Sequence, residues 1–478
     1  MSEGSSHVEG TAGGAANAPV GPTHAAWRPA ERIGQAGLGL GVFLLHLLLA
    51  LRLDRLGAFD RFNTLFGSDP NLRLEALRRS DSSFWLPHPG LSYVLGLPLK
   101  GVAKIVAALA PGDPGTAEIG RALALGVAPL AAALQCLVVL HLLRRLGLAF
   151  GTAFLLALLS AVSMSAVVFG SVPETYCVSG LAIALGYVLL LRTARAGGGA
   201  QELQWLGVGV LTAAVTITNV AAIAVLYAAR AIRRTGRPGA AIARAAGMAA
   251  LAVAVAAAGG LVASKVVGVR HGQATSERAW IERYFVEDPV AHLATFPTAV
   301  VNGIAPPTPD LLPNFAVRRP GSAQGEGGPS EADAGARQAP GRNLPRDALR
   351  MAGGRLFRVT LQPSHHTLSV RNLVGVALLS ALAWAAIRRR GADPLLRLVC
   401  LASLTIVAVN WVFHGFWGGE AFLYSQHWHV PLIVLAAASA AAGRRRPRLT
   451  MAALAVTVAA VTVSNLVVLA RMLSMLGG

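Results

Sequence analysis

IGQAGLGLGVFLLHLLLALRL, residues 33–53, is long enough to cross a bilayer, and Arg52 is its only formally charged side chain. A transmembrane helix needs about 20 mostly apolar residues, and several further runs of that length follow. The chain is 54% hydrophobic and 14% charged, whereas soluble domains carry roughly a quarter charged residues. The alternating pattern of a transmembrane barrel is absent. We therefore expect an all-α polytopic membrane protein with about 10–12 transmembrane helices and some juxtamembrane helices outside the cytoplasm.

One apolar run has polar residues at its centre. Residues 205–227 read WLGVGVLTAAVTITNVAAIAVLY, with Thr218 and Asn219 in the middle. We favour a hairpin of two short helices over a single span, because the hairpin keeps both ends of the segment on the same side. The other predicted helices are 91–110, 118–143, 147–170, 176–194, 240–262, 370–388, 395–413, 429–443 and 449–470.

The net charge of +19 comes mainly from arginines placed at the ends of apolar runs. This is the positive-inside pattern, with a contribution from anionic lipid headgroups, and it argues against nucleic-acid binding. It places three segments on the extracytoplasmic side: 54–90, 263–369 and 414–428. One conflict stays open: if 91–110 and 118–143 both cross, Arg144 and Arg145 fall outside, unless one segment is re-entrant. The arginine clusters are Arg144–Arg145, Arg230 with Arg233–Arg234, Arg388–Arg390 and Arg444–Arg446.

Composition divides the chain into four regions. Residues 1–32 are predicted to be a disordered cytoplasmic tail, and 33–262 a catalytic transmembrane module with its first extracytoplasmic loop at 54–90. Residues 263–369 form an extracytoplasmic loop with a disordered insert at 318–347, and 370–478 a C-terminal transmembrane module. The flanks of the insert, 278–297 and 351–370, are expected to lie on the membrane surface as amphipathic helices. The three cysteines, Cys136, Cys177 and Cys400, have no metal-ligand spacing and are read as packing residues.

The loop at 54–90 concentrates acidic residues in a chain that has few of them. Residues 62–75 read FNTLFGSDPNLRLE, and Asp69 stands in the Ser-Asp-Pro turn with Arg73 four residues later. Asp before Pro is ordinary turn chemistry, but long loops between rigid helices often carry function. Asp69 is therefore either a catalytic carboxylate or a turn residue. The acids of this loop are Asp54, Asp60, Asp69, Glu75 and Asp81.

Two further polar residues stand at helix starts. His88 precedes Pro89, where it either donates to a phosphate or serves as an interfacial capping residue. Glu174 stands between two apolar helices, where a carboxylate is costly unless it is paired or hydrated. It either lines a polar cavity or complements the dipole of the helix that follows.

The stretch 410–429, NWVFHGFWGGEAFLYSQHWH, is the most unusual part of the C-terminal half. Its tryptophans and tyrosine suit an interfacial belt. That belt accounts less well for Glu420, His427 and His429. Aromatic faces beside polar donors also hold sugars and phosphates, so we select Glu420, Tyr424 and His427 as candidate substrate contacts. The pair of histidines with one glutamate is weak support for a metal site.

The order of these features resembles the GT-C superfamily of polytopic glycosyltransferases. The shared elements are a first helix, SDP in the long loop, HPGLSYVL opening the next helix, LLRRLGL at a helix end and TITN in a hairpin, all within residues 33–262. The resemblance implies transfer of a sugar from a polyprenyl-phosphate donor, as in mannosyl- and aminoarabinosyltransferases, with inversion and with Asp69 as general base. The acidic pair that this family often shows is absent, because Asp60 and Asp81 lie at some distance from Asp69.

The resemblance also implies partners and a location. The donor is a polyprenyl-phosphate-linked sugar, and the acceptor is a lipid, a glycan or a protein. No organic cofactor is implied, and dependence on a divalent cation stays open. The enzyme would lie in a bacterial inner membrane among its lipids, with its site on the extracytoplasmic side. The candidate substrate-binding residues are Arg73, His88, Glu174, Glu420, Tyr424 and His427.

Two other functions stay open. An O-antigen ligase or polymerase would use Arg270, His271, His292, His365 and His366 in the second large loop. A secondary transporter or flippase would show internal repeats and charged residues at mid-membrane depth. Neither feature is clear in this sequence.

Overall fold

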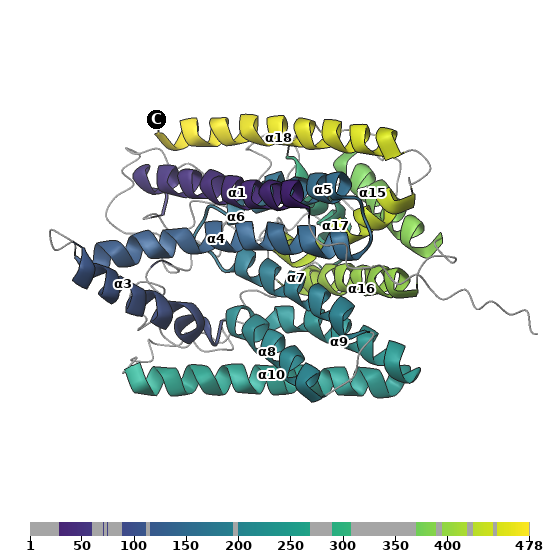
Figure 1. The fold of residues 1–478 in the computed structure, drawn as a ribbon, viewed down its shortest axis with the longest axis horizontal. Helices are drawn as coiled ribbons and strands as arrows, with labels where there is room; N and C mark the ends of the chain where they lie inside the picture. Colours follow the sequence, from purple (N-terminus) through teal and green to yellow (C-terminus); the bar gives the residue numbers. More distant parts are fainter. Residues whose placement is uncertain are drawn as a thin grey trace, which may run out of the picture.

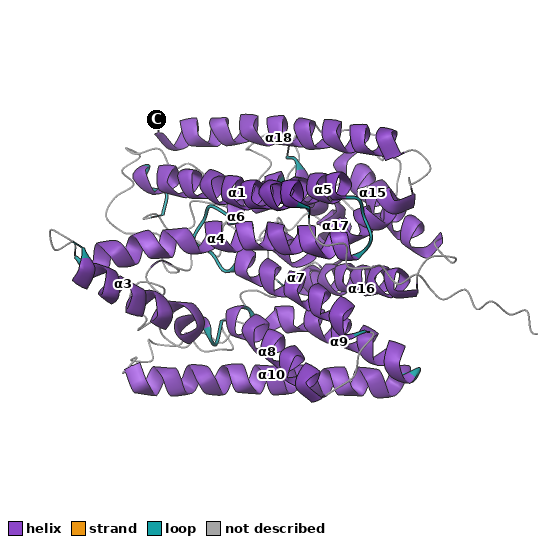
Figure 2. Cartoon of the chain, in the orientation of Figure 1, coloured by secondary structure: helices purple, strands orange, loops and turns teal. Residues whose placement is uncertain are grey.

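The computed structural model describes residues 28–59, 70, 74, 88–110, 115–194, 199–267, 289–306, 370–388, 394–417, 424–442 and 447–477. Within these ranges every regular element is a helix (Figure 2). The elements are α1 (Pro29–Arg55), η1 (Ser92–Gly96), α3 (Leu97–Leu109), α4 (Thr116–Arg145), α5 (Phe150–Val162), α6 (Met164–Phe169), α7 (Tyr176–Thr193), α8 (Gly199–Val215), η2 (Ile217–Asn219), α9 (Val220–Thr235), α10 (Pro238–Val267), α12 (Pro289–Ile304), α15 (Val370–Arg388), α16 (Pro394–Phe416), α17 (Ser425–Ala442) and α18 (Pro447–Gly477).

Six described helices are long and apolar enough to cross a membrane unaided: α1, α4, α7, α10, α16 and α18. Figure 1 shows α1, α4, α10 and α18 running nearly parallel along the long axis of the molecule. Shorter apolar helices, such as α5, pack between them. The prediction of an all-α polytopic membrane protein is thus confirmed.

Ion pairs at both ends of α1 and α4 fix their relative direction. Arg121, near the start of α4, lies 2.6 Å from Asp54, near the end of α1. Arg144, at the end of α4, lies 3.4 Å from Glu31, at the start of α1. The two helices are therefore antiparallel, and Arg144 lies at the end of the bundle where α1 begins. We call this end the arginine end.

The two ion pairs also resolve the topology conflict at Arg144. Because α4 begins beside the end of α1 and ends beside its start, Arg144 lies at the arginine end whichever way the intervening chain runs. The predicted helix at 91–110 is present, since η1 continues directly into α3 and residues 91–109 form one helical run.

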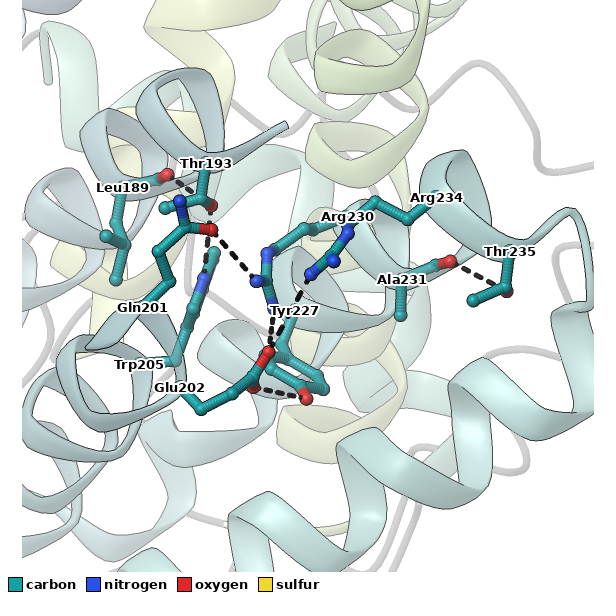
Figure 3. Close-up of polar contacts among 10 residues, drawn as sticks. All are labelled: Leu189, Thr193, Gln201, Glu202, Trp205, Tyr227, Arg230, Ala231, Arg234 and Thr235. Carbon is teal, nitrogen blue, oxygen red and sulfur yellow. Dashed lines mark hydrogen bonds and ion pairs between the residues drawn. The ribbon is translucent and has the colours of Figure 1, made fainter. Parts of the chain in front are cut away.

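The polar centre of 205–227 breaks the chain into the predicted hairpin. The helix α8 stops at Val215 because Thr216 is extended (φ −155°), and α9 begins at Val220. Arg230 Nη1 donates to Glu202 Oε1 over 2.8 Å, which brings the far ends of the two helices together (Figure 3). With 17 and 16 residues, α8 and α9 are each about 25 Å long. The hairpin prediction is confirmed.

A polar network holds the open ends of this hairpin at the arginine end. Arg230 is 1% exposed, and its Nη2 donates to Gln201 Oε1 over 3.1 Å. The Tyr227 hydroxyl donates to Glu202 Oε2 over 2.7 Å, and the Arg230 guanidinium lies over the Tyr227 ring. Figure 3 also shows Thr193, the last residue of α7, against Trp205 of α8, whose ring nitrogen donates to the Thr193 hydroxyl. The end of α7 is therefore also at the arginine end.

The large core cluster packs α4, α7, α9, α16 and α17 around buried Leu140, Tyr187, Ile223, Val399 and Val434. The Tyr187 hydroxyl is hydrogen-bonded to Ser403, 2.8 Å away. The three cysteines are buried and free, as expected of packing residues.

Two expectations about local structure were wrong. The predicted loop at 414–428 is shorter, because α16 continues to Phe416 and α17 begins at Ser425. The segment from Pro289 does not lie on the membrane surface, since α12 buries Phe296 and Val300 against α15 and α16. The Phe296 ring stacks on Trp411 and contacts Trp428, and these aromatic contacts hold α12 inside the bundle.

Candidate functional site

Four of the seven candidate site residues are described, and they gather away from the arginine end. Asp69, Arg73 and Glu420 lie outside the described residues. His88 contacts the last residue of α8, and His427 faces the first residue of α7. Both α8 and α7 have their other ends at the arginine end. The structure therefore brings together positions far apart in sequence at the opposite end of the bundle.

His88 caps a helix other than its own. Its Nδ1 donates to the carbonyl oxygen of Val215, and the Gly90 N–H donates to the carbonyl oxygen of Ala214 over 2.9 Å. Helix ends leave their last carbonyls without intrahelical donors, and these two contacts supply donors to α8. A carbonyl can only accept, so Nδ1 carries the proton of this contact. The contact fits the capping reading of His88, although the helix that it caps is α8 and not the helix that follows it.

The segment after His88 is also tied to α10. The Tyr93 hydroxyl donates to the carbonyl oxygen of Ala256 over 3.0 Å. Residues 88–93 therefore connect α8 with α10, and they hold His88 at the tip of the hairpin.

Gly90 is required where this segment meets α8. A β-carbon at Gly90 would clash with that of Ala214 and lie 2.6 Å from the Tyr93 hydroxyl. We expect Gly90→Ala to lower the free energy of unfolding by about 1–3 kcal/mol, as overpacking does, and to displace His88. Unfolding in detergent measures the change. Gly101→Ala is the control, because its β-carbon meets nothing within 4 Å. Equal stability of the two variants would contradict this packing.

His427 is buried among rings and lacks hydrogen bonds. It is 1% exposed, and neither ring nitrogen has a hydrogen-bond partner among the described residues. Its ring centroid lies 5.6 Å from that of Tyr424 and 6.0 Å from that of Tyr176. A buried polar group without a partner is rare and costly. We therefore expect the His427 ring to form a hydrogen bond with a ligand.

The aromatic wall around His427 comes from three helices. His414, on α16, stacks on Tyr424 with centroids 4.1 Å apart, and it lies 5.8 Å from His427. Tyr176 opens α7 and meets Tyr424 edge-on at 6.0 Å. The next residue in α17, Trp428, packs against Phe296 in a core cluster and also meets His414 edge-on, with centroids 5.7 Å apart. The belt interpretation therefore fails for Trp428, which is a buried core residue.

Glu174 lies in the turn between α6 and α7 and is 6% exposed. Its Oε2 accepts the N–H of Thr175, the N-cap residue of α7, over 3.3 Å. This contact fits the helix-dipole reading. Because Glu174 is two residues before Tyr176, it also lies beside the His427 wall, so both readings of Glu174 agree with the geometry.

A buried polar chain next to the site was missed in the sequence. Gln135 of α4 donates to Gln426 of α17 over 3.1 Å, and Gln426 donates to Ser165 of α6 over 2.7 Å. Ser165 is also hydrogen-bonded to Ser425. These positions are up to 291 residues apart, and Gln135 appears in the sequence as one polar residue in an apolar helix. Only the unusual cost of such residues in hydrocarbon could have indicated them.

His429 has a structural role. Its Nε2 lies 3.1 Å from the Ser160 carbonyl oxygen and 3.0 Å from the Ser160 hydroxyl. These contacts connect α17 with α5. In the part of the chain that the structure describes, no three histidine, cysteine or acidic side chains are grouped to hold a metal ion.

No protein-family model and no curated protein matches the chain.

Proposed function

We propose that the chain is a GT-C-type glycosyltransferase of a bacterial inner membrane. It would move a sugar from a polyprenyl phosphate to a lipid, glycan or protein acceptor on the extracytoplasmic side, opposite the arginine end. The observation that carries the proposal is the meeting of Tyr176, His414 and His427, from three separate helices. Glu174 lies two residues before Tyr176, and Ser179 of the same helix donates to Thr216 at the break between α8 and α9. Irregular backbone within a membrane is tolerated where it is buried in protein or lines a cavity.

The proposed reaction is a single displacement. An acceptor hydroxyl attacks the anomeric carbon, the bond from that carbon to the phosphate oxygen breaks, and the lipid monophosphate leaves. Asp69 takes the hydroxyl proton as the new bond forms. Arg73 and His88 stabilise the charge that develops on the phosphate. Tyr424 offers a ring face to the sugar, while Glu174 and Glu420 accept hydrogen bonds from its hydroxyls.

A panel of donors tests this proposal. The purified protein in nanodiscs is given undecaprenyl-phosphate-linked mannose, glucose, arabinose and aminoarabinose, with a total membrane extract as the source of acceptors. We expect release of undecaprenyl phosphate from at least one donor, with the sugar recovered on an acceptor in inverted configuration. Movement of intact donor across a vesicle membrane without cleavage would indicate a flippase and contradict the proposal.

Sidedness is tested separately by cysteine labelling. The native cysteines are buried, so background reaction with a membrane-impermeant maleimide is low. Thr116, at the start of α4, and Ala240, at the start of α10, are exposed at opposite ends of the bundle. We expect Thr116→Cys to react in intact cells and Ala240→Cys to react only after permeabilisation. The reverse pattern would place the site in the cytoplasm.

A further inference from the structure

The start of α7 is buried and only partly capped. Thr175, its N-cap residue, is 3% exposed and makes no side-chain cap hydrogen bond. Among the described residues, the backbone N–H groups of Cys177 and Val178 make no hydrogen bond outside the helix. α7 has 18 residues, so its aligned peptide dipoles put partial positive charge at this buried end.

Two buried side chains beside this helix end also lack partners. The Thr175 hydroxyl and both nitrogens of His427 have no hydrogen bond among the described residues. His427 reaches this point from α17, with its ring 6.0 Å from Tyr176, the first residue of α7. A hydroxyl, an imidazole and two backbone N–H groups are therefore left to meet a ligand, and all of them can donate hydrogen bonds.

We infer that the start of α7 is a phosphate site, formed by the Cys177 and Val178 N–H groups, the Thr175 hydroxyl and the His427 imidazole. Helix N-termini bind anions because N–H groups and the helix dipole both favour negative charge. The inference rests on the proposed function for the identity of the ligand, the phosphate of a polyprenyl phosphate. In this assignment the phosphate is bound by residues at the start of α7 and not only by residues of the loop at 54–90.

Glu174 gives the site a distinctive property. Its carboxylate already accepts the Thr175 N–H, two residues before the first of the N–H groups assigned to the phosphate. Two negative groups so close repel each other, so an arriving phosphate competes with Glu174. Removing this charge should strengthen phosphate binding even if it slows sugar transfer.

The test uses soluble phosphates and no sugar. The full chain in phosphatidylcholine nanodiscs is titrated calorimetrically with farnesyl phosphate, dihexanoyl phosphatidic acid and inorganic phosphate. We expect Thr175→Val and His427→Phe each to weaken binding about tenfold, since each removes a hydrogen bond to a charged group. Glu174→Gln should tighten binding severalfold. Thr462→Val is the matched control, because it removes a hydroxyl bound only within α18, and its affinity should equal that of the wild type.

Folding does not confound the result. The Thr175 hydroxyl has no partner to lose, so Thr175→Val should leave the unfolding temperature unchanged or raise it. Binding of farnesyl phosphate alone identifies an isoprenoid phosphate, and equal binding of phosphatidic acid identifies lipid phosphates in general; both support the site. Absence of binding by the wild type, or equal affinities in all variants, would overturn it. If no donor is turned over but the variants follow this pattern, the transferase proposal fails and the phosphate site stands.

Discussion

Asp69→Asn is expected to lower the rate of sugar transfer by about 10²–10⁴-fold, the usual contribution of a positioned general base. Asparagine has nearly the same shape as aspartate and is equally favourable before a proline in a turn, so expression and unfolding temperature should not change. The amide cannot take the proton of the acceptor hydroxyl. Release of undecaprenyl phosphate under saturating donor measures the effect.

Asp54, an acid of the same predicted loop, provides the control. It pairs with Arg121 in a partly exposed salt bridge, and such a pair contributes only about 0–1 kcal/mol. Asp54→Asn should therefore retain normal turnover. Full activity of Asp69→Asn would show that Asp69 is not the general base, and the interpretation as an ordinary turn residue would then hold.

Glu202→Ala is expected to destabilise the protein by about 2–3 kcal/mol. It leaves the Arg230 guanidinium, 1% exposed, without its anion, and breaking a fully buried pair costs about 3–5 kcal/mol. The lower value applies because the Glu202 side chain is 48% exposed. The double variant Glu202→Ala with Arg230→Met should recover most of the loss, since no buried charge remains. Unfolding in sodium dodecyl sulfate measures the stability of both variants. If the double variant is as unstable as Glu202→Ala, the broken ion pair is not the cause of the loss of stability.

Glu202 also predicts how this stability depends on pH. Burial alone would raise the pKa of Glu202, but hydrogen bonds from Tyr227 and Arg230 and the charges of Arg230 and Arg234 outweigh burial and lower that pKa. A carboxyl group with a lowered pKa in the folded state stabilises the fold above its unfolded pKa, about 4.3. That stabilisation is lost as the pH falls through the folded pKa. Between pH 7 and pH 3 the wild type should therefore lose more stability than Glu202→Ala, and parallel pH profiles would contradict this.

The architecture was predictable where local chemistry decides it. Apolar length indicates the long helices, and arginines at their ends give one common side. The hairpin followed from the arginines, which need both ends of 205–229 on one side, and from Thr218 and Asn219, which interrupt the apolar run at its centre. The direction of α4 was harder, because only the pairing of Arg121 with Asp54 and of Arg144 with Glu31, 67 and 113 residues apart, shows that it runs antiparallel to α1.

The site was only partly predictable because it depends on contacts between distant segments. His88 was selected as a phosphate donor or cap, but its acceptor, Val215, is 127 residues away. His427 and Trp428 are adjacent in sequence, yet the turn of α17 points one toward Tyr176 and the other into the core. Thr175 gave no signal at all, since its importance lies in a hydroxyl that the fold leaves without a partner.

A cryo-electron microscopy structure of the Asp69→Asn protein, bound to the undecaprenyl-phosphate sugar that the donor panel identifies, tests the central claim most directly. We predict density for the phosphate at the start of α7, within hydrogen-bonding distance of Thr175 and His427. The sugar should lie on the Tyr424 side, with its anomeric carbon facing residue 69. Phosphate density at the arginine end, or no bound lipid at saturating donor, would contradict the proposed site.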